Sequence, residues 1–260
     1  MDFALPSVGF LVGVLIGMTG MGGGALMTPI LVLGFGISPS VAVGTDLIYA
    51  AVAKSAGVWV HHRHGTIRWK IVRLLAAGSV PSAILTVFLL AQIKSLGVNY
   101  DRFITLVLAV ALILTSAVLV VKSLRRPAEK ITGPSPMESR LRRHRKAFTV
   151  LAGVLVGVLV SLSSVGAGVL GVAMLLFLYP RLPVMSIAGT DLAYAVPVAA
   201  VAGLGHLQIG HVDYALLGAL LVGALPGTYL GGRLGTRLPD RVVRPILAAC
   251  LFAVGLRCAL

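Results

Sequence analysis

Long apolar stretches separated by short polar segments run through nearly the whole chain. In the first half they cover roughly residues 3–20, 24–37, 40–62, 68–92 and 101–123, and in the second half 147–164, 168–180, 184–206, 213–232 and 242–258. A helix that crosses a bilayer needs about 20 mostly apolar residues, and most of these stretches approach that length. The pattern therefore predicts an all-α polytopic membrane protein with about five helical elements in each half.

The composition agrees with a membrane location. Apolar residues make up 58% of the chain and charged residues 12%, whereas a soluble domain has about 25% charged residues. The net charge of +14 first suggests nucleic acid, but Lys and Arg concentrate in a few loops, as the positive-inside bias of membrane proteins predicts. Because no soluble domain presents these basic groups, we expect a lipid bilayer and no nucleic acid as partner.

A four-residue motif reveals an internal duplication. Gly-Thr-Asp-Leu occurs at Gly44–Leu47 and again at Gly189–Leu192. The same offset of 145 residues aligns further pairs, among them Tyr49 with Tyr194, His61 with His206 and Gly78 with Gly223. We therefore expect a first transmembrane repeat over residues 1–123, a basic linker over 124–146 and a second transmembrane repeat over 147–260.

The charge of matching loops predicts how the repeats are oriented. The loop after the third element of the first half is basic, with Arg63, Arg68, Lys70 and Arg73, but its counterpart around 206–213 has no Lys or Arg. After the fourth element it is the second-half loop that is basic, with Arg233, Arg237, Arg241 and Arg244. Since Lys and Arg stay in the cytoplasm, matching loops face opposite sides. The repeats are thus predicted to be inverted, with the linker cytoplasmic and the N-terminus outside.

Each half also has a glycine-rich break in its apolar pattern. The first contains Gly20, Gly22, Gly23 and Gly24, and the second contains Gly166 and Gly168. A helix that starts after such a break presents unpaired N–H groups and the positive end of its dipole, which together bind anions. Close helix packing through small residues is the alternative. The element after each break is short, so broken helices and re-entrant hairpins both fit the pattern.

The duplicated motif places an acid, Asp46 or Asp191, inside each half's apolar region. An ionised carboxylate in hydrocarbon costs about 2.5–3.5 kcal/mol on insertion scales, so each acid should face the interior and have a partner. Lys54 lies about two helical turns after Asp46, and the second half has Ala199 at the matching position. Three interpretations stay open: Lys54 binds an anionic substrate, the acids bind protons and couple transport to them, or all three form a structural ion network.

Other polar residues near the motif are weaker candidates. Thr45 and Thr190 can donate hydrogen bonds to an anion or to their own helix, while Tyr49 and Tyr194 either line the same cavity or simply pack. The expected substrate-binding residues are Gly20, Gly22, Gly23, Gly24, Thr45, Lys54, Gly166, Gly168 and Thr190, and the expected proton-coupling residues are Asp46 and Asp191. No nucleotide-binding or catalytic motif occurs, so we expect no enzyme activity, cofactor or metal.

The run Gly20-Met-Gly-Gly-Gly24, followed by Pro29 and Ala42-Val-Gly-Thr45 and repeated in weaker form in the second half, resembles the sulfite exporter TauE/SafE family. The resemblance extends from about Gly9 to Gly255, apart from the linker. It implies a secondary transporter of the bacterial cytoplasmic membrane that moves small sulfur oxyanions, such as sulfite or sulfoacetate, by alternating access. Many members carry Ser after Gly-Thr, where this chain has Asp46 and Asp191. A passive anion channel and a non-transporting accessory membrane protein are the alternatives.

Overall fold

The computed structural model describes residues 4–19, 24–124, 144–235, 252 and 255–257. Every regular element in these ranges is helical, and no strand occurs among them. Six of the helices are long and apolar enough to cross a membrane. The prediction of an all-α polytopic membrane protein is therefore confirmed.

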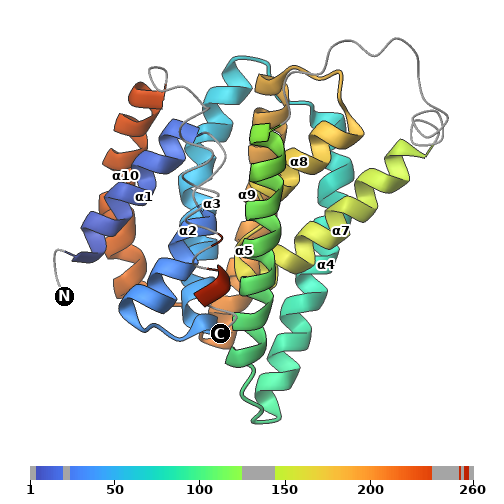
Figure 1. Ribbon diagram of the computed structural model, residues 1–260. Coiled ribbons are helices and arrows are strands. Elements are labelled where there is room, and N and C mark those ends of the chain that lie inside the picture. Colours follow the sequence, from blue (N-terminus) through green and yellow to red (C-terminus); the bar gives the residue numbers. More distant parts are fainter. Residues whose placement is uncertain (1–3, 20–23, 125–143, 236–251, 253–254, 258–260) are drawn as a thin grey trace.

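The helices follow the predicted elements closely (Figure 1). The first half forms α1 (Ala4–Thr19), α2 (Gly24–Pro29), the short π-helix η1 (Ile30–Gly34), α3 (Pro39–Arg63), α4 (Trp69–Ser95) and α5 (Asp101–Leu124). The second half forms α7 (Arg145–Ser163), α8 (Val169–Leu178), α9 (Val184–Ile209) and α10 (Tyr214–Gly235). These bounds lie within a few residues of the predicted ones. Most of the linker and of the element expected over 242–258 falls outside the described residues.

Proline and glycine account for several of the helix ends. α3 begins at Pro39, where the missing N–H is one that a helix start leaves unpaired in any case. α9 ends before Gly210, whose φ of 79° lies in the left-handed region and whose N–H caps carbonyls of the last turn. Pro29 separates α2 from the π-helical turn that follows it, since proline removes a backbone donor from the helical ladder.

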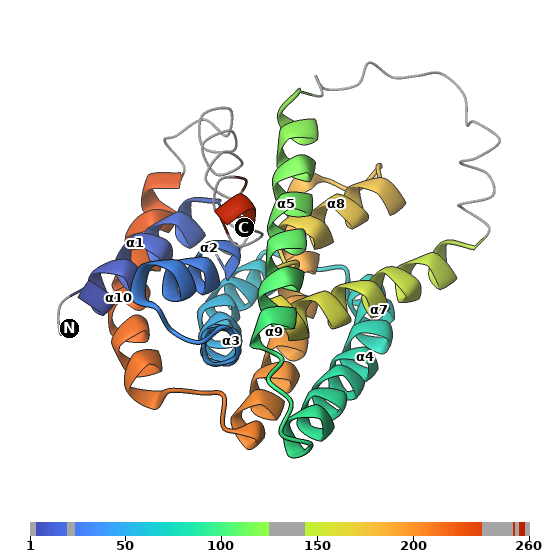
Figure 2. The same ribbon diagram turned by 60° about the horizontal axis from the view of Figure 1, so that its bottom comes forward.

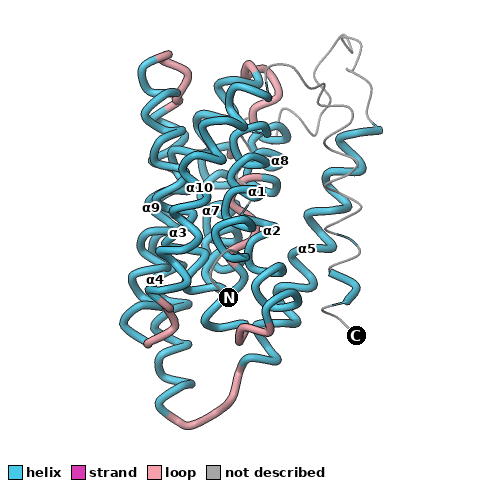
Figure 3. The backbone as a smooth tube through the Cα atoms, turned by 90° about the vertical axis from the view of Figure 1, so that its left-hand side faces the viewer, coloured by secondary structure: helices cyan, strands magenta, loops and turns pink. Residues whose placement is uncertain are grey.

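An antiparallel pair of long helices, α3 and α9, forms the centre of the molecule (Figures 1 and 2). The Leu192 side chain lies against Gly57, near the end of α3, and Gly203 lies against Ile48, near its beginning. The remaining helices pack around this pair, as the side view also shows (Figure 3). The α3–α9 pair therefore provides the frame on which the buried polar residues are placed.

Two helix crossings join the halves of the chain (Figure 2). α1 packs mainly on α10, and α7 packs mainly on α4. Both crossings are close because they pass over glycine: a Cβ on Gly9 would overlap the carbonyl oxygen of Leu220, and a Cβ on Gly153 would overlap that of Leu75. Small residues allow such close backbone approach between membrane helices. The first helix of each half is thus held by the fourth helix of the other half.

Candidate functional site

A buried, unwound segment separates α7 from α8. Ser164 ends α7 with a φ of 56°, and Gly166 and Gly168 have φ values of 125° and 131°, which L side chains rarely adopt. Every residue from 161 to 172 is buried. The predicted break in the second half is therefore present. Of the matching break in the first half, residues 20–23 lie outside the described ranges, and Gly24 begins α2.

This segment presents backbone donors to the interior. The N–H groups of Gly171 and Val172 bond to the carbonyls of Gly166 and Gly168. Those of residues 166–170 make no hydrogen bond to any described residue. A helix start leaves its first N–H groups unpaired, and such groups in a buried position are costly unless something binds them. The break thus offers several backbone donors at one place.

Lys54 of α3 reaches the break. Its Nζ donates a hydrogen bond of 3.0 Å to the carbonyl oxygen of Ala167, and the side chain is 4% exposed. The charges of Asp191 and Asp46 both act on this ammonium group. A buried cation needs such compensation, so the unwound backbone binds Lys54 and the charges of both acids compensate its own.

The surroundings of Asp46 contain several polar atoms without partners. Thr28 of α2 donates a 2.6 Å hydrogen bond to Oδ2 of the carboxylate, and the hydroxyls of Tyr49 and Ser164 lie near it. Asp46 Oδ1, Tyr49 Oη and Ser164 Oγ are buried and have no hydrogen-bond partner among the described residues. The Ser164 hydroxyl is placed to donate to the carboxylate. Because buried polar atoms are normally satisfied, the remaining ones make this place a candidate site for a polar ligand or water.

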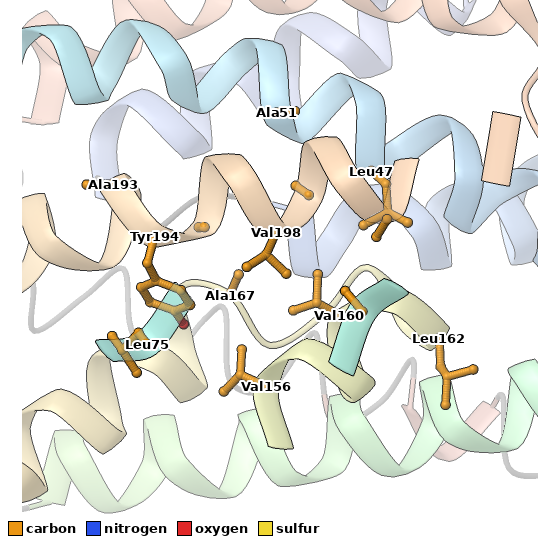
Figure 4. Close-up of a cluster of buried hydrophobic side chains, with 14 of the residues drawn as sticks. Leu47, Ala51, Leu75, Val156, Val160, Leu162, Ala167, Ala193, Tyr194 and Val198 are labelled. Atoms are coloured by element: carbon orange, nitrogen blue, oxygen red, sulfur yellow. The ribbon is translucent and has the colours of Figure 1, made fainter. Parts of the chain in front are cut away.

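The surroundings of Asp191 are tighter. The Tyr194 hydroxyl lies beside its carboxylate, and a Cβ on Gly171 of α8 would overlap both Asp191 Oδ1 and Tyr194 Oη. Figure 4 shows Tyr194 extending from α9 toward the layer that contains Ala167 and the unwound segment. The acid of the second half is therefore packed directly against the start of α8.

The charged residues form a buried row along the seam between α3 and α9. Because these helices run antiparallel, the helical rise of ~1.5 Å per residue places Asp46 and Asp191 about 18 Å apart along the axes, with Lys54 between them. The break runs beside this row, with Ser164 near Asp46, Ala167 at Lys54 and Gly171 at Asp191. The acids thus do not meet each other; each lies on its own side of the single lysine.

The two motif threonines hold loops of the opposite half. Thr45 Oγ1 accepts a hydrogen bond of 3.2 Å from the backbone N–H of Asp213, and Thr190 Oγ1 accepts one of 3.0 Å from that of Arg68. Thr190 also donates to the Ser186 carbonyl. Arg68 and Asp213 are themselves 145 residues apart, so the two contacts match across the duplication. The structure places the threonines at opposite ends of the seam.

Three residues of this site carry no signal that the sequence alone would show. Thr28 and Gly171 lie in short helices with unremarkable neighbours, and Ser164 lies beside the glycines of the break. Their contacts with the acids depend on how the broken helices are folded back onto the seam. Only the repeat of the break, which pairs residues 19–24 with 163–168, pointed to this region.

A buried charged row beside an unwound segment, inside a bundle of six candidate spans, is typical of polytopic membrane proteins of the transporter class. Residues 5–258 match the family described as sulfite exporter TauE/SafE, and the chain belongs to that family. The confirmed family is the one that the glycine run and the Gly-Thr motif resemble.

Curated relatives agree with this class. The chain is 35% identical to "Probable membrane transporter protein YjnA" of Bacillus subtilis (strain 168) over 257 residues, which cover 99% of each chain. It is 30% identical to "Probable membrane transporter protein YdhB" of the same organism over 240 residues, 90% of this chain and 91% of the relative. No solved structure matches the chain significantly. The family is described as an exporter and both relatives as probable membrane transporters, which agrees with the prediction of a transporter and not an enzyme.

Proposed function

We propose that this protein is a secondary transporter that moves small sulfur oxyanions, such as sulfite or sulfoacetate, across the bacterial cytoplasmic membrane by alternating access. The observation that carries the proposal is the buried row of Asp46, Lys54 and Asp191 beside the α7–α8 break. Ionisable residues at membrane depth mark substrate or ion pathways. The family description supports sulfite or a related anion as the substrate class.

The break and Lys54 supply the donors that an oxyanion needs. The N–H groups from Gly166 onward and the positive end of the α8 dipole attract negative charge. Lys54 has three N–H donors, of which one is bonded to Ala167, so the ammonium group can turn to a bound anion. The glycines at 20–24 are proposed to contribute in the same way from the first half. Thr45 and Thr190 adjoin the acids and are proposed to border the site.

The charges of the row favour proton coupling. With both acids ionised, two carboxylates face one ammonium group, so the row has an excess negative charge before any substrate enters. A bound oxyanion adds another negative charge in surroundings of low dielectric constant, where repulsion is strong. Protons on Asp46 or Asp191 would remove that repulsion. We therefore propose that these two acids carry protons together with the anion.

The matching contacts of the halves support movement about the α3–α9 seam. Each half's first helix crosses the other half's fourth helix, and each motif threonine holds a loop of the other half. Such pairing fits two inverted repeats that rock against each other around a central site. The basic loop near Arg68 is proposed to face the cytoplasm and the loop near Asp213 the outside.

Flux of labelled sulfite and sulfoacetate into proteoliposomes, with and without an imposed pH gradient, tests the proposal. Accumulation driven by the gradient is the expected result. Flux that only dissipates the substrate gradient would instead identify a passive channel. Absence of flux for both anions, with folded protein in the membrane, would contradict this substrate class.

Variants of the acids test the coupling separately. Asp46→Asn and Asp191→Asn are expected to abolish accumulation driven by the pH gradient, because an amide cannot carry the proton. Asp213→Asn is the matched control, since Asp213 lies outside the row and its Oδ1 accepts hydrogen bonds from the first N–H groups of α10, which an amide oxygen also does. Unchanged accumulation in both row variants would remove proton coupling through these acids.

A further inference from the structure

A groove between α4 and α9 lies on the outside of the bundle. The two helices lie side by side (Figure 3) and enclose a volume of about 630 Å³. The floor is formed where Gly205 meets Val87, since a Cβ on the glycine would overlap that side chain. Ile84, Phe88 and Leu204 form the rim and are 55%, 57% and 58% exposed. Because both helices are candidate spans, this apolar groove opens to lipid.

The groove covers the depth of one lipid leaflet. On α4 it runs from Ile84 to Ser95, the last residue of the helix, and on α9 from Val201 to Ile209, the last residue there. At a rise of ~1.5 Å per residue, the α4 side is about 16 Å long. Half of the hydrocarbon core of a bilayer is about 15 Å thick. The groove therefore extends from the middle of the spans to one membrane surface, as one acyl chain does.

Polar side chains line the groove only at its surface end. Lys94, Ser95 and Gln208 lie there, and the other lining residues are apolar or glycine. Lys94 is exposed, and its Nζ donates a 2.5 Å hydrogen bond to the Ile209 carbonyl oxygen. No Asp or Glu in the described ranges pairs with it. An ammonium group has three N–H donors, so Lys94 keeps two for a ligand at the membrane surface.

The charge at this end favours an anionic lipid as the occupant. Capping of α9 accounts for one donor of Lys94, since a helix C-terminus attracts cations, but it leaves the groove and the other donors unexplained. A second copy of this chain, with a net charge of +14, would bring mainly further cations to Lys94. A phospholipid instead combines an acyl chain with a phosphate, which basic groups between membrane helices bind.

We propose that the α4–α9 groove binds one anionic phospholipid, with its phosphate on Lys94 and an acyl chain between the rim residues. The two remaining N–H groups of Lys94 donate to phosphate oxygens, and the Gln208 amide borders the headgroup. The lipid belongs to the leaflet in which α4 and α9 end, the one proposed to face the outside. This inference requires only that the protein lies in a membrane, and it rests neither on the substrate nor on proton coupling.

Native mass spectrometry of the full-length protein tests the headgroup contact. The protein is released from micelles that contain equal amounts of phosphatidylglycerol and phosphatidylcholine with the same acyl chains. The wild type is expected to retain one phosphatidylglycerol in preference to phosphatidylcholine. Lys94→Gln should lower that preference about fivefold, which is the contribution of one lysine near anionic lipid, and Lys94→Arg should keep it.

The glutamine amide can still donate to the Ile209 carbonyl, so the cap of α9 is retained in Lys94→Gln. An equal lipid preference in the wild type and in Lys94→Gln would overturn the proposal.

A variant that fills the groove tests the acyl-chain contact. Ala91 of α4 lines the groove, and Ala91→Phe should reduce the retention of both lipids, because the ring occupies the space of the chain. Ala77→Phe is the matched control, since Ala77 is exposed on the same helix outside the groove. Equal retention in the two variants would overturn the proposal. So would a wild-type dimer that retains no lipid and that Ala91→Phe converts to monomers, since a second copy would then fill the groove.

A measurement on the wild type alone covers the case in which a variant does not fold. Phosphatidylglycerol that carries a diazirine in the middle of one acyl chain is irradiated with the protein in nanodiscs. The label should concentrate in peptides that cover residues 84–91 and 201–205, in excess over the lipid-exposed stretch of α10 around Val222 and Leu225. Equal labelling of both regions would overturn the proposal. Because no transported anion is used, the result is independent of the flux assays above.

Discussion

Gly171 lies so close to Asp191 that a single methyl group on the glycine would overlap the carboxylate oxygen Oδ1. The same methyl group would overlap the hydroxyl of Tyr194. The start of α8 thus packs so closely against Asp191 that no side chain larger than glycine fits between them. A position in a ten-residue helix thereby controls the surroundings of a charge on another helix.

Gly171→Ala is expected to destabilise the protein and to reduce transport. Forcing an extra methyl group into a packed core costs typically about 1–3 kcal/mol, and here it displaces either Asp191 or α8. Thermal unfolding in detergent and flux in proteoliposomes measure the two effects. Gly218→Ala in α10 is the control, since nothing lies within 4 Å of its Cβ position and alanine favours a helix. Equal stability of the two variants would show that α8 and Asp191 can shift at little energetic cost to accommodate the methyl group.

Thr28→Val is expected to destabilise the protein more than Thr228→Val. Thr28 donates to Asp46 from another helix, and its loss leaves a buried carboxylate with one partner fewer, at a cost of about 1–3 kcal/mol. Among the described residues, Thr228 Oγ1 donates only to the Ala224 carbonyl of its own helix. Chemical denaturation gives both free energies of unfolding. Thr28→Ser should restore stability, and no difference between the two valine variants would mean that Asp46 gains little from Thr28.

Lys54→Gln is expected to destabilise the protein, because it leaves both acids without their shared cation. Adding Asp191→Asn should recover part of that stability, since charges that belong to one network typically couple by about 0.5–3 kcal/mol. We expect transport to stay lost in the double variant, because the proposed ligand of the anion is missing. Recovery of transport would instead assign Lys54 to neutralising the acids. Lys70→Gln, at an exposed position, is the control.

The sequence predicted the helices better than the site. The bounds of α3 follow from an apolar run that starts at a proline, which is local information. Asp46 and Asp191 stand out because a charge in hydrocarbon is costly whatever surrounds it. Their partners are non-local: Thr28 and Gly171 meet the acids only after the broken helices fold back.

The motif threonines and the histidines show the same limit. Thr45 and Thr190 are adjacent to the acids in sequence, but their hydroxyls bond to loops that are more than a hundred residues away. His206 and His211 are five residues apart, on either side of the end of α9. That spacing alone predicts no contact between their rings, whose Nδ1 atoms lie 3.3 Å apart. The Tyr100 hydroxyl lies 3.0 Å from His211 Nε2, although the two residues are 111 positions apart. Hydrogen bonds between residues so far apart in sequence depend on how the helices are arranged in space, which the local sequence pattern does not encode.

The crossing of α1 over α10 and of α7 over α4 makes the two halves mutually dependent. Neither half contains the main packing partner of its own first helix, and glycine backbones form the contact on both sides. Covalent continuity through residues 125–143 is therefore not what keeps the halves together. A chain cut in that stretch should therefore remain one complex. Two half-chains expressed in the same membrane should also associate through these crossings.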